Sequence, residues 1–200
     1  EIGNPITGIA CLAQNLREER EEDDEITEIS GQILEQTKRV SRIVQSLMSF
    51  AHAGGHQNHD EAVCLAEVAQ DAIGLLALNR RNFEVQFYNL CDPEHWVVGD
   101  SQRLAQVLIN LLRNALDAMA NAPHKRLEIR LHADQQLWHL SVSDSGGGIA
   151  EEHLNNVFDP FFTTKPVGDG LGLGLAVSYA IVHELGGRLS AANHGDGAVF

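Results

Sequence analysis

Two closely spaced glycine clusters constrain the fold and function of this chain more than any other feature. Residues 144–148 (DSGGG) end a segment that alternates like a β-strand, and residues 168–174 (GDGLGLG) open an apolar helical segment. Glycine lets the backbone approach a ligand closely, and a helix N-terminus offers unpaired N–H groups and a positive dipole end. Glycines that only form turns are the alternative, but a strand-ending cluster followed by a helix-opening one predicts a phosphate site.

A loop of mixed character separates the two clusters. Residues 158–165 (FDPFFTTK) are apolar and turn-prone, and Lys165 ends the run with a positive charge. Long loops inside compact domains are usually functional. We therefore expect a lid in which Phe158 and Phe161 anchor the loop and Lys165 neutralises a phosphate. A solvated surface charge is the alternative for Lys165.

Four motifs, in this order, resemble the ATP-binding domain of sensor histidine kinases, within the gyrase, chaperone and kinase ATPase superfamily. Residues 110–118 (NLLRNALDA) match its N box, 144–148 its G1 box, 158–165 its F box and 170–174 (GLGLG) its G2 box. The resemblance implies an α/β sandwich that binds ATP with Mg²⁺. Together with the N-terminal segment, it covers nearly the whole chain.

The resemblance also implies roles for single residues. Asp144 would accept a hydrogen bond from the exocyclic amine of adenine, as an ionised carboxylate can, with an Asx turn as the alternative. Asn114 would give its side-chain oxygen to Mg²⁺, and Asn110, one turn earlier, would assist it. Asp117 lies on a neighbouring face and participates less directly. The full set implied for nucleotide binding is Asn110, Asn114, Asp117, Asp144, Gly146, Gly148, Lys165, Gly170, Leu171, Gly172, Leu173 and Gly174.

Residues 1–51 are predicted to form a helical hairpin, because their apolar residues recur at alternating spacings of three and four. The resulting seam comprises Ile2, Ile6, Ile9, Ala13 and Leu16, and then Ile26, Ile29, Ile33, Val40, Ile43, Leu47 and Phe50, with Gln36 as an interruption. Leu12, Leu34, Val44 and Met48 widen this face beyond what one hairpin can bury. Two hairpins can bury it as a four-helix bundle, so we expect a homodimer. The acidic run 18–28 is expected to be a solvated turn at the hairpin tip.

The first residues, Glu1-Ile-Gly-Asn-Pro5, resemble the H box of the same family. The phosphoacceptor histidine of an H box would come just before Glu1. By resemblance, Glu1 is the general base for that histidine, and Asn4 orients a water for dephosphorylation of the partner. Gly3 departs from the family's frequent arginine, which puts any contact made by that arginine in doubt. No H-box context surrounds His52, His56, His59, His95 or His183, so we assign none of them as the acceptor.

The remaining chain divides into a linker, residues 52–60, and a catalytic domain, residues 61–200. The linker histidines lack a rigid framework that would preorganise metal ligands. In the domain, we expect helices at 65–79, from Asp100 or Ser101 to about Met119, and at 171–185, the last closed by Gly186-Gly187, and strands near 83–87, 127–131, 138–142, 188–192 and 198–200. Antiparallel strands with helices on one face make an α/β sandwich, so the fold class of the whole chain is α+β.

Composition excludes several classes of protein. The formal net charge is −14, which disfavours nucleic acid as a partner. Three widely spaced cysteines predict neither a disulfide framework nor a zinc motif and favour a reducing, cytoplasmic compartment. No apolar run approaches the ~20 residues that span a bilayer, and we expect no membrane contact from these residues. Because the chain lacks an initial Met and ends within a predicted strand, we interpret it as a fragment of a longer protein, whose membrane anchoring stays open.

These expectations converge on the dimerisation and catalytic core of a sensor histidine kinase. It would bind Mg·ATP, phosphorylate the histidine before Glu1 and pass the phosphoryl group to an aspartate of a response regulator receiver domain. A serine kinase or conformational ATPase on the same fold is one alternative, against which the heptad hairpin and the H-box resemblance argue. A non-enzymatic dimerisation scaffold is another, against which the intact Asn114 and Asp144 argue.

Overall fold

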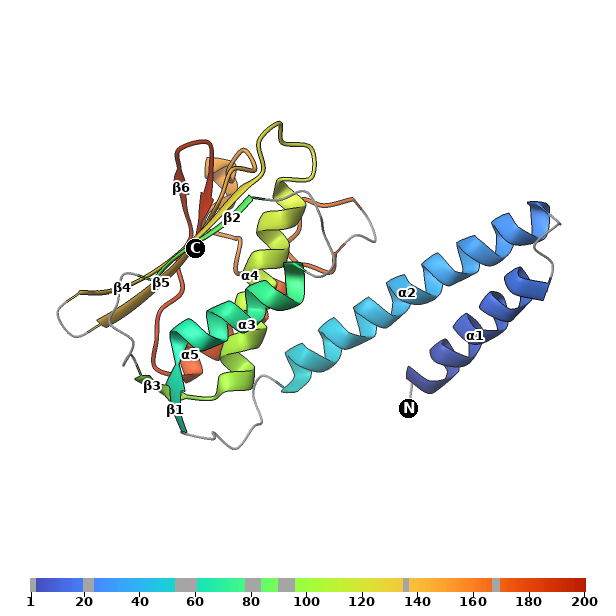
Figure 1. Ribbon diagram of the computed structural model, residues 1–200, viewed down its shortest axis with the longest axis horizontal. Helices are drawn as coiled ribbons and strands as arrows, with labels where there is room; N and C mark the ends of the chain where they lie inside the picture. Colours follow the sequence, from blue (N-terminus) through green and yellow to red (C-terminus); the bar gives the residue numbers. More distant parts are fainter. Residues whose placement is uncertain are drawn as a thin grey trace.

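The computed structural model describes residues 3–19, 24–52, 61–77, 84–89, 96–134, 137–166 and 170–200. They form a long helical hairpin and an α/β domain (Figure 1). The hairpin extends away from the domain, and its second helix contacts a helix of the domain layer. The predicted linker, residues 52–60, lies outside the described residues apart from its first.

The hairpin consists of α1 (Gly3–Glu19) and α2 (Asp24–His52), which confirms the predicted pair of helices. Ile6 and Ala13 of α1 are buried against α2, where the small polar residues Ser30 and Thr37 are also buried. Both hydroxyls bond to carbonyls one turn earlier, Ser30 to Thr27 at 3.1 Å and Thr37 to Ile33 at 2.7 Å. Because these side chains are short and internally satisfied, the two helices can pack closely along that line.

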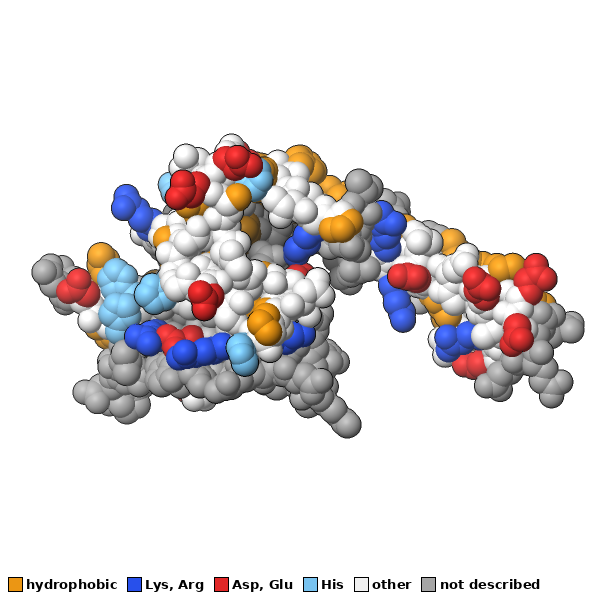
Figure 2. Space-filling model, turned by 90° about the horizontal axis from the view of Figure 1, so that it is seen from above, with side chains coloured by type: hydrophobic (Ala, Val, Ile, Leu, Met, Phe, Trp, Pro, Cys, Tyr) orange, Lys and Arg blue, Asp and Glu red, His pale blue; other side chains and the backbone are white. Residues whose placement is uncertain are grey.

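Much of the predicted apolar seam stays exposed in one hairpin. The large apolar side chains exposed on α1 and α2 are Ile9, Leu12, Leu16, Ile29, Ile33, Val40, Leu47 and Met48. Figure 2 shows hydrophobic side chains along the upper edge of the hairpin. A groove of about 410 Å³ runs between the helices and is lined by Ile6, Ile9, Ile29, Gln32, Ile33, Gln36, Thr37 and Val40. This exposed apolar surface exceeds what a solvated hairpin normally presents.

The domain is built on a five-stranded sheet in the order β2-β4-β5-β7-β6. The strands are β2 (Glu84–Asn89), β4 (Arg126–Asp134), β5 (Leu137–Asp144), β6 (Ala192–His194) and β7 (Gly197–Val199). The neighbouring strands β4, β5, β7 and β6 are antiparallel, as predicted, but β2 runs parallel to β4. The parallel pair was not expected, because a chain must cross over the sheet to form it and no local pattern records that path.

Three helices cover one face of this sheet: α3 (Leu65–Ala77), α4 (Ser101–Ala118) and α5 (Gly174–Glu184) (Figure 1). Leu127, Ile129 and Leu131 of β4 alternate inward and are almost completely buried. Leu127 and Ile129 pack with the apolar face of α4 and with Val177 and Ile181 of α5. The alternation of the strand and the helical period of α4 therefore meet in one core, as the predicted α/β sandwich requires.

Several predicted boundaries change. The helix expected at 171–185 begins only at Gly174, and the strand expected at 188–192 is found at Ala192–His194. A second sheet, β1 (Glu61–Cys64) paired with β3 (Trp96–Gly99), was not predicted, because strands this short carry little pattern. A 3-10 turn, η1 (Glu151–His153), also went unpredicted.

Helix-end signals were more reliable than strand boundaries. The Asp100 carboxylate caps α4 by accepting hydrogen bonds from the N–H groups of Gln102 at 2.9 Å and Arg103 at 3.1 Å. Gly186 follows α5 with φ +77°, as a C-terminal glycine should. Within the described ranges, no helix combines the length and apolar character needed to cross a bilayer.

Candidate nucleotide-binding site

Asp144, the last residue of β5, is 9% exposed. Its Oδ1 accepts hydrogen bonds from the backbone N–H of Gly146 at 2.7 Å and of Ala198 at 3.4 Å. Burial raises the pKa of this carboxyl above its usual value, while the two backbone donors partly oppose the rise. Asp144 is therefore a desolvated hydrogen-bond acceptor at the end of a central strand. The two backbone N–H groups orient its carboxylate.

The first glycine loop packs directly on the end of α4. A Cβ on Gly146 would lie 2.6 Å from the Cβ of Ala118, so only glycine allows this approach. Ser145 ties the same loop to the segment between α4 and β4, because its hydroxyl donates to the His124 carbonyl at 2.8 Å. The G1 and N boxes are therefore in contact although they are far apart in sequence.

Along α4, Asn110 and Asn114 make different contacts. The Asn110 amide donates to the Gly174 carbonyl at 3.2 Å and to the Ser178 hydroxyl at 3.3 Å, so it ties α4 to α5. Asn114, one turn later, presents its Oδ1 to the Lys165 ammonium at 3.3 Å. Of the two amides, Asn114 is the one directed toward the lid.

Lys165 reaches from the lid back to α4. Its ammonium lies 2.8 Å from Asp117 Oδ2 in an ion pair whose two side chains are each about one-third exposed. The sequence predicts a phosphate as the partner of Lys165 and a lesser role for Asp117, and the pairing of the two was not predicted. Residues 48 positions apart leave no local signal for such a contact.

The two lid phenylalanines differ from each other. Phe158 packs its ring against Tyr179, with centroids 5.3 Å apart, and against Phe200 at 6.5 Å, so it anchors the lid as expected. Phe161 is 61% exposed, so it is less enclosed than the anchoring role leads one to expect. Its backbone also holds the loop: φ is +68° and its N–H donates to the Gly172 carbonyl at 3.0 Å.

The second glycine loop holds the lid by a close backbone approach. Gly172 has φ +67°, and a Cβ there would lie 2.3 Å from the Phe162 carbonyl oxygen. Leu173 is buried with 1% exposure and Leu171 is half-buried, so Leu173 has only its backbone to offer a ligand. Among the residues that the structure describes, none caps the N-terminus of α5 with its side chain, and this helix starts at Gly174 beside Asn110. An uncapped helix start behind a glycine loop suits an anionic group.

The structure describes little of the two site residues predicted at the N-terminus, Glu1 and Asn4. Glu1 lies outside the described residues, and Asn4 is in the first turn of α1 with its side chain outside them. No group of three or more His, Cys, Asp or Glu in the described part of the chain is arranged to hold a metal. The side-chain oxygen of Asn114 on α4 fits Mg²⁺ nevertheless, because this ion takes oxygen ligands, including those of phosphates, and keeps several waters.

A buried strand-end carboxylate, an amide-bearing helix and a lid between glycine loops define a class of nucleotide-binding ATPase domain. Residues 99–200 match the family described as histidine kinase-, DNA gyrase B-, and HSP90-like ATPase. Residues 1–55 match the His Kinase A (phospho-acceptor) domain. This chain belongs to the sensor histidine kinases of two-component systems.

Individual relatives agree with this assignment. The C4-dicarboxylate transport sensor protein DctB of Pseudomonas aeruginosa is 36% identical over 98% of this chain, which spans 32% of that protein. The histidine kinase ThkA, solved in complex with the response regulator protein TrrA, is 25% identical over 98% of this chain and 56% of its own, with a TM-score of 0.72. Full-length ShkA in complex with AMPPNP shares the fold at 20% identity, with a TM-score of 0.80 over 99% of this chain and 42% of its own.

Proposed function

We propose that this chain is the dimerisation and catalytic core of a protein-histidine kinase, and that residues 61–200 bind ATP with Mg²⁺. The observation that carries the proposal is the convergence of three motifs on α4, which itself carries the fourth. Gly146 packs on its end, Asn110 holds the start of α5, and Lys165 of the lid reaches Asn114. This convergence supports a ligand enclosed between the two glycine loops and the lid.

The nucleotide would lie across these motifs from base to phosphate. Asp144 would accept the adenine amine beside Gly146 and Gly148, and Asn114 would supply an oxygen to Mg²⁺. The backbone of residues 170–174 and the start of α5 bind the phosphates. Lys165 exchanges Asp117 for a phosphate oxygen, so Asp117 acts on the site by holding that ammonium. Catalysis in phosphoryl transfer consists mainly of such positioning and charge neutralisation.

The helical hairpin, residues 1–51, supplies the acceptor side. We infer that the phosphoacceptor histidine immediately precedes Glu1, that Glu1 is its general base and that Asn4 orients a water in dephosphorylation; the H-box resemblance supports this. The linker predicted at residues 52–60 connects this hairpin to the catalytic domain. A second copy of the hairpin covers the exposed apolar face of α1 and α2, so the active form is a homodimer with a four-helix stem.

The phosphoryl group then passes to an aspartate of a response regulator. Support comes from the similarity to ThkA, which was solved in complex with the response regulator TrrA. We place this core in the cytoplasm, where ATP is available, and we assign any membrane anchoring to other segments of the parent protein.

A binding experiment tests the nucleotide site. Asn114→Ala should abolish Mg²⁺-dependent binding of ATP by the 200-residue chain in calorimetry and leave the hairpin associated. Asn121→Ala, an exposed asparagine just beyond α4, is the matched control and should bind as the unaltered chain does. Undiminished binding by the Asn114 variant would contradict the proposal.

A labelling experiment tests the reaction. The parent protein incubated with radiolabelled ATP should acquire acid-labile, base-stable phosphate on the residue that precedes Glu1. Acid-stable phosphoserine on a partner, or ATP turnover without phosphohistidine, would favour the serine kinase or conformational ATPase instead.

A further inference from the structure

We propose that Asn193 is a positioning residue: it clamps the first glycine loop so that Asp144 is held ready for the adenine amine. The inference rests on the proposed function, since it concerns the base end of the same nucleotide site. Asn193 lies in β6, outside the four motifs, and no role follows for it from those motifs.

The clamp is a pair of reciprocal hydrogen bonds. Asn193 Oδ1 accepts from the Ile149 N–H at 2.7 Å, and Asn193 Nδ2 donates to the Ile149 carbonyl at 2.7 Å. One side-chain amide thus satisfies both backbone groups of a loop residue that belongs to no strand or helix. Serine and threonine carry a donor and an acceptor on a single oxygen, whereas the asparagine amide carries them on two atoms and can bond to both backbone groups at once.

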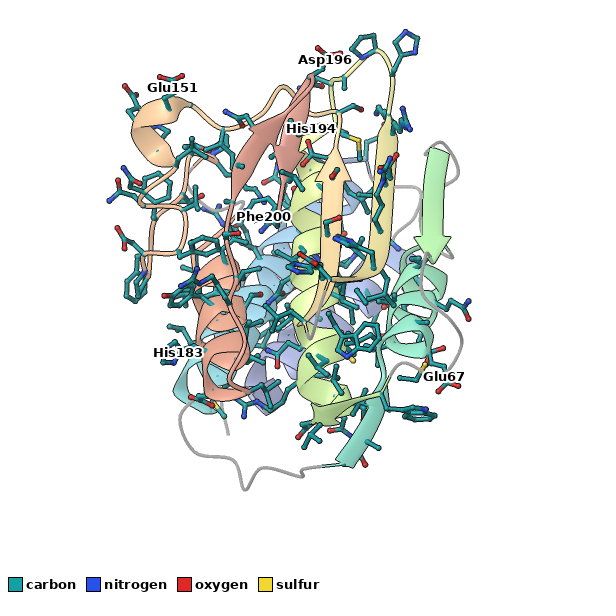
Figure 3. All side chains as sticks on the ribbon, turned by 90° about the vertical axis from the view of Figure 1, so that its left-hand side faces the viewer. Glu67, Glu151, His183, His194, Asp196 and Phe200 are labelled. Carbon is teal, nitrogen blue, oxygen red and sulfur yellow. The ribbon has the colours of Figure 1, made fainter. Side chains whose placement is uncertain are left out.

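The loop approaches the clamp at contact distance. Gly148 has φ +76°, and a Cβ there would lie 2.8 Å from Asn193 Oδ1. A second attachment lies beside it, where the Gly147 N–H donates to the Asp196 carbonyl at 2.8 Å. Figure 3 shows Asp196 and His194 at the tip of the β6–β7 hairpin, above the C-terminal Phe200.

The same hairpin also contacts Asp144 itself. The Ala198 N–H of β7 donates to Asp144 Oδ1 at 3.4 Å, and a Cβ on Gly197 would lie 1.7 Å from the Asp144 carbonyl oxygen. Ala198 is the strand partner of Asn193. One hairpin therefore holds both ends of the loop, Asp144 through β7 and Ile149 through β6.

In this arrangement, the orientation of the Asp144 carboxylate depends on the hydrogen bonds between Asn193 and Ile149. Asp144 is oriented by the Gly146 N–H within the loop, and the loop is rich in glycine, whose backbone is the most costly to order. Releasing Ile149 would remove the attachment at the far end of the loop and leave the bonds of Ser145 and Gly147 to hold it. The carboxylate would then have to be ordered when the nucleotide binds, which weakens binding.

The test separates the base end of the ligand from its phosphates. Calorimetry on the 200-residue chain compares ATP with purine riboside triphosphate, which lacks the 6-amino group. Asn193→Ala should weaken ATP binding by about tenfold, because it removes the effect of one or two neutral hydrogen bonds. Its affinity for the purine analogue should stay within about twofold of that of the unaltered chain. His194→Ala, the exposed neighbour in β6, is the matched control and should bind both ligands normally.

A second variant guards against loss of folding. Asn193→Asp keeps the size of the side chain and the acceptor for the Ile149 N–H but loses the donor to its carbonyl, so it should weaken ATP selectively as well. In an Asp144→Ala background, Asn193→Ala should cause no further loss, because the two residues act in series.

The outcomes are distinguishable. Unchanged ATP affinity in both Asn193 variants overturns this inference and leaves the proposed function intact. Equal weakening of ATP and the purine analogue, or additive losses with Asp144→Ala, also overturns it, because that result assigns Asn193 a general structural role. If the unaltered chain binds no ATP, the proposed function falls and takes this inference with it.

Discussion

At the scale of single residues, Asp144 combines burial with a requirement for charge. Its carboxyl is desolvated at the end of β5, which raises its pKa, and only the ionised form is a full acceptor for the adenine amine. For folding the sign is opposite. A native carboxyl with a raised pKa binds a proton more readily than the unfolded chain does. Rising pH between the two pKa values therefore lowers the contribution of Asp144 to stability.

We predict that ATP affinity falls as the pH decreases. The fall should begin at a higher pH than it would for an aspartate with an ordinary pKa. Protonation of Asp144 removes the acceptor, and its raised pKa moves this loss upward. Calorimetric titrations across mildly acidic pH measure the effect. Asp144→Asn provides the control, because titration of the nucleotide itself affects both proteins. If the two proteins lose affinity in parallel, the carboxyl is not responsible.

Gly172 offers a second test at this scale. Gly172→Ala places a side chain in the left-handed region and within 2.3 Å of the Phe162 carbonyl, so the lid must move. We expect ATP affinity to fall at least about tenfold. Gly186→Ala has similar strain at φ +77° but open space around its Cβ, so it should cost ~1 kcal/mol of stability and leave affinity unchanged. Equal affinities for the two variants would contradict a specific lid contact.

At the scale of elements, α4 contacts every other part of the proposed site. Its two asparagines separate in role: Asn110 bonds to Gly174 and Ser178 of α5, while Asn114 faces Lys165. Ser178 is itself completely buried and bonds back to Gly174 at 2.9 Å. The junction of α4 and α5 is therefore held by polar groups inside an apolar layer, where an unpaired group is costly.

We expect Asn110→Ala to lower the free energy of unfolding by about 1–2 kcal/mol, because it removes partly buried hydrogen bonds between two helices. Asn114→Ala should change stability by less than about 0.5 kcal/mol while abolishing Mg²⁺-dependent binding. Urea unfolding monitored by circular dichroism measures both variants. The distinction fails if the Asn114 variant is the less stable of the two.

The contact between lid and α4 gives another prediction. Lys165 must leave Asp117 to reach a phosphate, so Asp117→Asn should tighten ATP binding at low ionic strength. The gain should not exceed about fivefold, since partly exposed ion pairs contribute less than about 1 kcal/mol. Lys165→Ala should weaken binding instead, and salt should reduce both effects. Weaker binding by the Asp117 variant would mean that its carboxylate contacts the metal or nucleotide directly.

At the scale of the whole molecule, the hairpin carries both charged and apolar surface. Figure 2 shows acidic and basic side chains on the domain and on the hairpin, and the hairpin also has exposed apolar residues along its length. A net charge of −14 would keep copies apart unless burial of the apolar stem outweighs repulsion. Association should therefore occur through the hairpins.

We predict that Ile33→Glu converts the dimer to a monomer. Ile33 is 37% exposed and lines the groove between α1 and α2, so a carboxylate there would be buried without a partner in the four-helix stem. Glu35→Lys, an exposed position of α2, is the control and should remain dimeric. Sedimentation velocity at micromolar concentration measures the state, and a monomeric unaltered chain would disprove the stem.

Sequence alone determined the parts of this protein that local patterns encode. The spacing of apolar residues from Ile26 to Leu47 predicts a long helix. Asp100 is predicted as an N-cap, and it caps α4. The alternation from Leu127 to Leu131 predicts a buried strand. The ordered glycine and asparagine motifs pointed to the nucleotide site. Each of these signals arises within a few turns of one element, where neighbours in sequence are neighbours in space.

Only the tertiary structure decided which distant groups meet. The parallel pairing of β2 with β4, the approach of Lys165 to Asp117, and the grip of Asn193 on Ile149 join segments that no short pattern relates. The last two contacts span 48 and 44 residues. They exist because the sheet order brings β6 beside the first glycine loop and the lid folds back on α4. Chain topology sets such contacts, and local propensity carries no record of it.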